Sequence, residues 1–159
     1  MSGDRSRAAQ DLIDDIAVRS GLAAEPTSVA VTLVAAFLSG SLGERRLTDL
    51  HRRIPEFGEL ASEGETRRAA IAAERAGGTL AGRLFASFGD LAGGDDGGPV
   101  ARMMTLIGHL GRIGLGSGDM RALAGGMIGH VRERLGDDYV DTMVAKARAR
   151  LPIIGRYLT

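Results

Sequence analysis

The chain of 159 residues contains no cysteine and no tryptophan, and aromatic residues make up only 4% of it. Without cysteine, it can form neither a disulfide framework nor a cysteine-based zinc site, and it has no thiol nucleophile. Because aromatic side chains are so few, the core must consist of Leu, Ile, Val, Ala and Met. Such side chains suit closely packed helices better than sheets, so the composition favours an all-α protein.

Excess charge and long hydrophobic segments are also missing. Lys and Arg together number 20, as do Asp and Glu, so no net charge attracts the chain to nucleic acid or to an anionic membrane. The longest apolar run, VAVTLVAAFL at residues 29–38, is about half as long as a bilayer-spanning helix and predicts a buried helix. The charged N-terminal residues do not resemble a signal peptide. We therefore expect a cytoplasmic protein with no transmembrane segment and no nucleic-acid partner.

A repeated pattern organises the chain. The pairs Gly21-Leu22 and Leu42-Gly43 recur 93 residues later as Gly114-Leu115 and Leu135-Gly136. Each copy has the pattern of three helices separated by glycine turns, and each ends in an aliphatic-Pro-x-x-Gly segment, IPEFGEL or LPIIGRYL. The second proline comes four residues later than the offset requires, which is about one helical turn. The two prolines are therefore interpreted as equivalent endings of two three-helix units.

The predicted fold is an all-α helical bundle of roughly seven to eight helices in one compact domain. Between the two copies, Ser62 and Glu65 form a capping-box pattern that predicts the start of an Ala-rich helix, and Thr79 is a second candidate cap. GGDDGG at residues 93–98 is the expected linker. The predicted parts are a first pseudo-repeat at 1–60, inserted helices with the Gly-rich linker at 61–98, and a second pseudo-repeat at 99–159.

Outside residues 61–100, these motifs resemble a known group of proteins. The segments are LVAAFLSGSLG with LTDLHRRIPEFGEL in the first copy, and GLGSGDM with MIGHVRERLGDDYVDTMVAKARARLPIIGRYL in the second. The pattern resembles small bacterial all-helical families of uncharacterised function, notably the VcgC/VcgE-like domain. That resemblance implies a helical fold and no established catalytic residues, so it assigns no chemistry to any position.

No set of polar residues in the sequence indicates a reaction. His51 and His130 lie at or beside apolar stripes, where a hydrogen-bonded core or boundary histidine is the simplest interpretation, and His109 lies off its stripe and is expected in solvent. GRIGLGSGD at residues 111–119 lacks the strand and the Gly-Lys-Ser/Thr ending of phosphate loops, so its glycines are expected to end one helix and start the next. No paired metal-ligand spacing occurs. We expect a protein that is not an enzyme and has no cofactor.

Methionine is unevenly distributed. All methionines except the initiator lie in the second copy, at positions 103, 104, 120, 127 and 143, on helices that also contain several glycines. Methionine adapts to varied apolar partners, and several glycines in helices imply close helix contacts or loose packing. The pattern is compatible with an ordinary core that the segment around Phe85 and Phe88 fills. It is also compatible with an apolar groove lined by Met120, Leu123, Met127 and Met143.

Two classes of function follow from these alternatives. The leading expectation is a protein–protein interaction or assembly module, because closely packed helices that contain glycine pair readily across a two-fold axis, as in a homodimer. The alternative is a binding protein for an apolar small molecule or lipid that occupies the Met/Gly-rich groove.

Overall fold

The computed structural model describes residues 5–41, 44–78 and 98–150, which form seven α-helices and no strand. The prediction of an all-α fold is therefore confirmed. The helix predicted from Thr79, residues 93–97 of the linker and the segment LPIIGRYL lie outside the described residues. The helices are α1 (Arg7–Ser20), α2 (Ala24–Ser41), α3 (Glu44–Arg53), α4 (Pro55–Gly78), α6 (Gly98–Arg112), α7 (Ser117–Leu135) and α8 (Asp137–Arg150).

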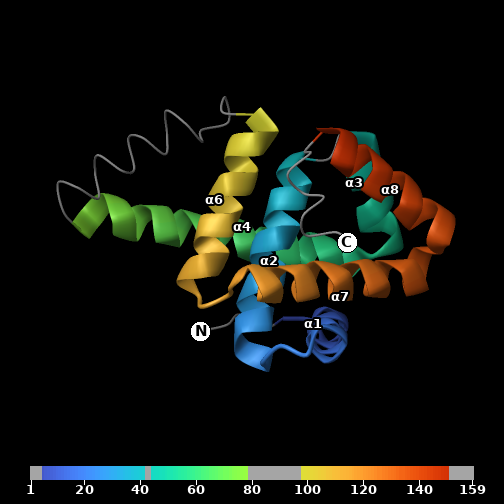
Figure 1. Cartoon of the computed structure of the whole chain (residues 1–159), viewed down its shortest axis with the longest axis horizontal. Coiled ribbons are helices and arrows are strands. Elements are labelled where there is room, and N and C mark those ends of the chain that lie inside the picture. The colour runs from blue at the N-terminus through green and yellow to red at the C-terminus, as the bar shows by residue number, and fades with distance from the viewer. Residues whose placement is uncertain (1–4, 42–43, 79–97, 151–159) are drawn as a thin grey trace.

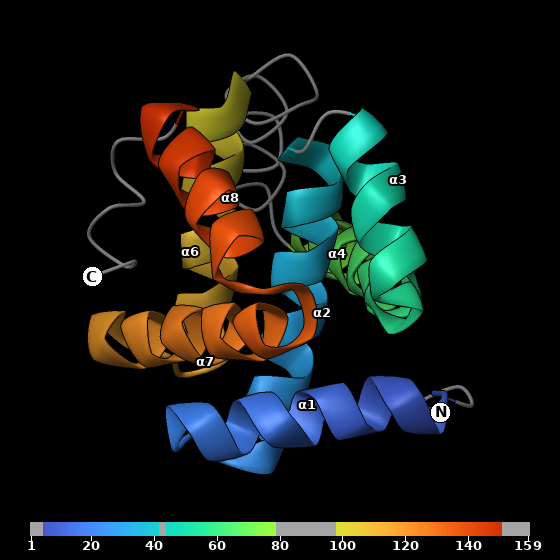
Figure 2. The same ribbon diagram turned by 90° about the vertical axis from the view of Figure 1, so that its right-hand side faces the viewer.

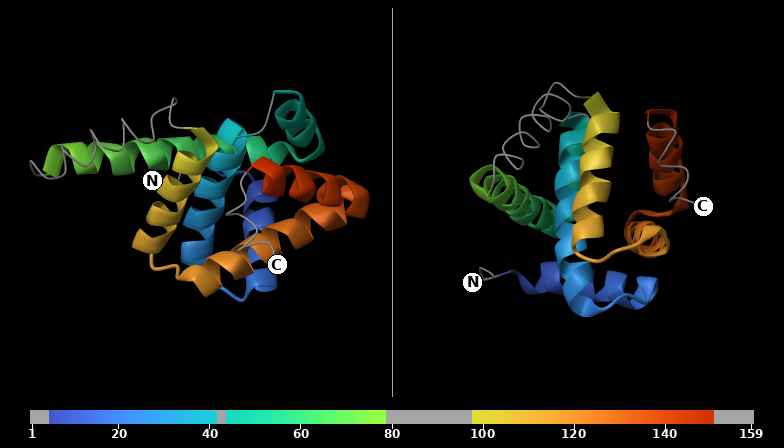
Figure 3. Two further views of the ribbon diagram at one scale, coloured as in Figure 1. Left: turned by 45° about the horizontal axis from the view of Figure 1, so that its top comes forward. Right: turned by 60° about the vertical axis from the view of Figure 1, so that its left-hand side comes forward.

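Helix α2 lies at the centre of the fold, with α6 alongside it and α4 crossing it (Figure 1; Figure 3). The apolar run at residues 29–38 forms the middle of this helix, and six of its ten residues are buried. The prediction of a buried helix is confirmed. No single described helix is long and apolar enough to cross a membrane, although α1 and α2, bent by 112° at their junction, pass that test together.

Helices α1 and α7 run side by side beneath the rest of the molecule (Figure 2). The Ser6 hydroxyl caps α1 by accepting a hydrogen bond from the Ala9 N–H, and Gly21 ends it in the left-handed conformation at φ 70°. Gly126 of α7 contacts α1 so closely that a Cβ there would lie 3.1 Å from the Ile16 carbonyl oxygen. Gly126 therefore allows α7 to pack closely against α1.

The start of α4 differs from the prediction. The capping-box pattern at Ser62 and Glu65 predicted a helix start, but α4 begins at Pro55, directly after α3, and both residues lie inside it. Proline suits the first turn of a helix because the N–H it lacks has no intrahelical partner there, and its fixed φ is already helical. The segment IPEFGEL thus opens a helix, and α4 runs across the predicted boundary between residues 60 and 61.

Helix α4 packs against α2 with almost no space between the two backbones. A Cβ on Gly64 would lie 1.8 Å from the Thr32 carbonyl oxygen and 2.9 Å from the Ala36 Cβ. Arg5 reinforces this junction from the N-terminal side, since its guanidinium donates hydrogen bonds to Glu63 at 2.5 Å and to Ser28 at 2.9 Å. Burial raises the pKa of Glu63, but hydrogen bonds from Arg5 and Arg67 lower that pKa by more, so the carboxylate stays charged.

We predict that Gly64→Ala lowers the free energy of unfolding by about 2 kcal/mol or more, because its methyl group would collide with the α2 backbone. Gly108→Ala is the matched control. Gly108 lies within α6, and a Cβ added there would meet no neighbouring atom within 4 Å, so the substitution should stabilise by roughly 0.5–1 kcal/mol through helix propensity. Urea unfolding followed by circular dichroism measures both, and equal effects of the two substitutions would contradict the close contact.

Candidate functional site

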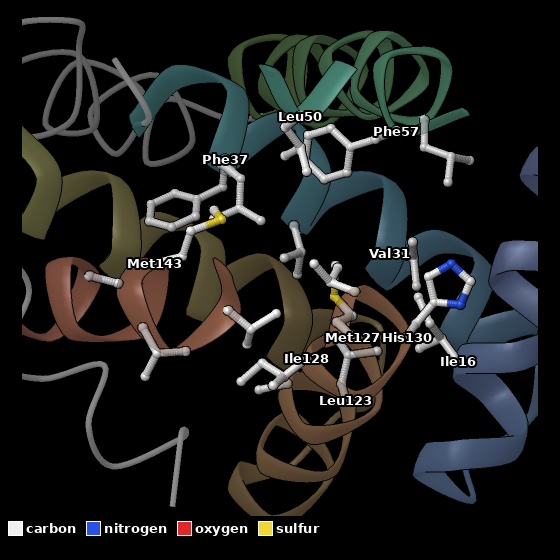
Figure 4. A pocket seen from close by; sticks show the side chains of 18 of the residues that line it. Ile16, Val31, Phe37, Leu50, Phe57, Leu123, Met127, Ile128, His130 and Met143 are labelled. Carbon is white, nitrogen blue, oxygen red and sulfur yellow. The ribbon is translucent and has the colours of Figure 1, made fainter. Parts of the chain in front are cut away.

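An apolar cavity of about 250 Å³ lies among all seven described helices (Figure 4). Among the described residues that line it, all except Arg46, His130 and Lys146 have apolar side chains. Cavities of ~150 Å³ with such linings take up benzene, and pockets for drug-sized ligands hold about 300–1,000 Å³. The cavity is therefore large enough for a small apolar molecule.

The four residues predicted to form a groove all line this cavity. Met120, Leu123 and Met127 follow one another along α7, and Met143 extends from α8 toward Phe37 of α2 (Figure 4). Met120 and Leu123 are buried core residues, whereas Met127 and Met143 are only half-buried. The set thus divides into two residues that pack in the core and two that form the more open part of the cavity wall.

Sequence reasoning missed the opposite wall of the cavity. That wall comes from the first half of the chain, with Val31 and Phe37 on α2, Leu50 on α3 and Phe57 on α4 (Figure 4). A signal was present, since a helix that is apolar all round must pack on more than one side. The wall residues of α2 at positions 31, 34 and 38 are spaced as one helical face.

A partly buried ion pair lies where the cavity meets α1. His130 Nδ1 donates a hydrogen bond of 2.6 Å to Asp15 Oδ2, and Arg19 Nε donates one of 2.7 Å to the same oxygen. These two hydrogen bonds, that of His130 first, hold the pKa of Asp15 below its ordinary value. Because Nδ1 is engaged by Asp15, the buried Nε2 is the nitrogen that remains to contact a bound molecule.

The three histidines differ from one another in the structure. His130 is hydrogen-bonded at the boundary of the core, as predicted, and His51 is half-buried with its ring 5.7 Å from that of Phe57. His109 was expected in solvent, and this expectation is wrong, since it is only 6% exposed. It follows Leu106 by three residues and shares its face of α6, so both side chains point toward α2.

A second hollow, of about 300 Å³, lies between α2, α4 and α6 beside His109 and Arg102. Its walls mix apolar residues with the ion-paired Glu65 and Arg68, so it lacks the apolar character of the first cavity. No group of three His, Asp or Glu side chains among the described residues is placed to hold a metal ion. The apolar cavity is therefore the strongest candidate site.

Comparisons with protein-family models, curated proteins and solved structures find no match. The resemblance to the VcgC/VcgE-like domain stays a prediction.

We predict that Met127→Ala lowers the free energy of unfolding by less than about 1.5 kcal/mol, because its half-buried side chain already faces empty space. Leu123→Ala, one turn earlier on α7, is the comparison. Leu123 is 2% exposed, so its truncation should cost about 2–5 kcal/mol. Chemical denaturation measures both values. A core-like loss for Met127→Ala would mean that its side chain packs as ordinary core.

We predict that Asp15→Asn makes the protein less stable at neutral pH and that this loss disappears as the pH falls through the lowered pKa of Asp15. The pKa of Asp15 is lowered by folding, so its stabilising contribution is present above the unfolded pKa of ~3.9 and is lost as pH falls through the folded pKa. Melting temperatures of both proteins from pH 7 to pH 2.5 test this. Asp14→Asn, one residue earlier and exposed, is the control, and an equal pH dependence of the two variants would contradict the pairing.

Proposed function

We propose that this protein binds a small apolar ligand in the cavity between its helices and does not catalyse a reaction. The observation that carries the proposal is the cavity itself, about 250 Å³ in volume and lined almost entirely by apolar side chains of the described residues. Native cores are normally packed so tightly that voids larger than a water molecule are few. An apolar space of this size is therefore better understood as a site for a molecule than as a packing defect.

The lining suits a ligand that is held by shape and dispersion rather than by polar contacts. Each apolar side chain that faces empty space forfeits contacts that a bound molecule would restore. Met127 and Met143 are flexible and polarizable, so they can adjust to the shape of a ligand on the more open side. Another part of the lining is rigid because it consists of tightly packed residues. Among them are Leu123 and Val31, each at most 2% exposed.

The sequence ranks an interaction or assembly module first, and homodimer formation stays a prediction. The described surface supports an interaction module less well than the cavity supports ligand binding. Val18 and Met104 are the large apolar side chains that are most exposed among the described residues, and they lie on different helices, α1 and α6. A stable interface normally needs a contiguous apolar patch.

We also propose that the two halves of the chain are pseudo-repeats, α1–α3 and α6–α8. In support, the equivalent turn glycines Gly21 and Gly114 both have positive φ values, 70° and 93°. Further support comes from the same order in each half, where a helix, a glycine turn and a second helix are followed by a third helix.

Uptake of a neutral dye tests the ligand-binding proposal. We predict that Nile red binds the native protein with a fluorescence increase and that the neutral alcohol decan-1-ol raises the melting temperature. Ala147→Phe should abolish both effects without loss of stability, because Ala147 lines the cavity and a ring there would fill the space.

Ala149→Phe is the matched control, since Ala149 is on the same helix but exposed and outside the cavity lining. It should bind the dye and the alcohol as the native protein does. The proposal is wrong if neither probe binds the native protein. It is also wrong if Ala147→Phe and Ala149→Phe bind equally well. The sequence-based alternative, in which the segment with Phe85 and Phe88 fills this space, concerns residues outside the described part of the chain.

A further inference from the structure

Among the described residues that line the cavity, three have polar side chains, and two of these are cations on different helices. Arg46 is half-buried on α3, and Lys146 is exposed on α8. The third, His130, belongs to α7 and is held by Asp15. Because Lys146 lines the cavity and is also exposed, the cavity reaches the protein surface beside α8.

A contact between α3 and α8 places these two cations on the same side of the molecule. The Arg53 guanidinium lies over the Tyr139 ring, with its central carbon 5.2 Å from the ring centre. Arg46 precedes Arg53 by seven residues and Lys146 follows Tyr139 by seven, so each cation shares a helix face with the contact residue. Seven residues span roughly 10 Å. Helix α3 ends at this contact and α8 begins near it, and both helices extend from it toward the same side of the molecule (Figure 2). We therefore place both cations on that side of the contact.

Neither cation is neutralised by the described part of the protein. Arg52 and Arg53, on the same helix as Arg46, share the carboxylate of Asp49. Arg46 and Lys146 form no ion pair with a described carboxylate. Their long aliphatic stems can line an apolar wall while the charged ends stay in water. An apolar cavity bordered by two such cations is complementary to a molecule that has an apolar body and an anionic head.

We infer that the ligand is a single-chain carboxylate of medium length, in other words a fatty acid, with its carboxylate between Arg46 and Lys146. This inference rests on the proposed function. A volume of about 250 Å³ accommodates roughly eight methylene-sized groups if each occupies the ~30 Å³ of a water molecule in the liquid. A phospholipid with two long chains would not fit. The carboxylate would remain at the surface, so no buried charge is created.

Isothermal titration at pH 7.4 with three ligands of the same chain length tests the head group. The ligands are decanoate, decan-1-ol and decyltrimethylammonium, each below its aggregation concentration. We expect decanoate to bind roughly tenfold more tightly than the alcohol, since partly exposed ion pairs contribute only a modest factor each. The ammonium compound should bind most weakly. High salt should reduce the preference for decanoate because it screens exposed charges.

The double variant Arg46→Gln/Lys146→Met tests whether these two cations cause the preference. It should bind decanoate no more tightly than it binds decan-1-ol. Arg45→Gln/Arg112→Gln is the control, because it removes the same charge from exposed residues outside the cavity lining. This control should keep the preference for decanoate.

The results of these titrations distinguish a failure of the carboxylate inference from a failure of the proposed function. If decan-1-ol and decanoate bind the native protein equally well, or if the double variant keeps its preference for decanoate, the carboxylate inference is wrong while ligand binding stands. If none of the three compounds binds and Nile red also fails, the proposed function is wrong. A rise in affinity from hexanoate to decanoate that stops for longer chains is also expected, and equal affinity for all lengths would contradict a chain inside the cavity.

Discussion

The contact between Gly64 and the Thr32 carbonyl sets the geometry on which the rest of the structure depends. It brings α4 against one face of α2, where Thr32 and Ala36 are small enough to allow it. The larger residues of α2, among them Val31 and Phe37, then project on other sides and form a wall of the cavity. A helix that carries small residues on one face and large ones on another thus determines both where the backbones touch and where space remains.

The scarcity of aromatic residues explains why that space is not filled by the described core. The chain has four phenylalanines and no tryptophan, so little side-chain volume is available between α2 and the α7–α8 pair. Gly126 lets α7 pack closely against α1. Apolar side chains that face this space forfeit packing contacts, which lowers the stability of the fold. A bound apolar molecule would recover part of that free energy.

The sequence predicts local features well and contacts between distant helices poorly. The buried middle of α2 and the glycine turns after α1 and between α6 and α7 follow from an apolar run and from glycines within a few residues. The start of α4 was mispredicted because a capping-box pattern also occurs inside helices, where tertiary packing decides the outcome. The cavity wall on α3 and α4 was missed because periodicity identifies an apolar face but not its partner. The burial of His109 was missed for the same reason.

The position of α8 links the ligand to the stability of the fold. Helix α8 packs mainly against α7, and its Met143 and Val144 face the cavity while only half-buried. Its connection to α3 depends on Tyr139, which contacts Arg53 and hydrogen-bonds Asp49. A ligand would give the cavity-facing side chains of α8, such as Met143 and Val144, an additional apolar partner. Since a molecule that binds only the folded state stabilises it by mass action, occupancy of the cavity should act most strongly on this helix. Part of the free energy of ligand binding would therefore stabilise the packing of α8 against the other helices.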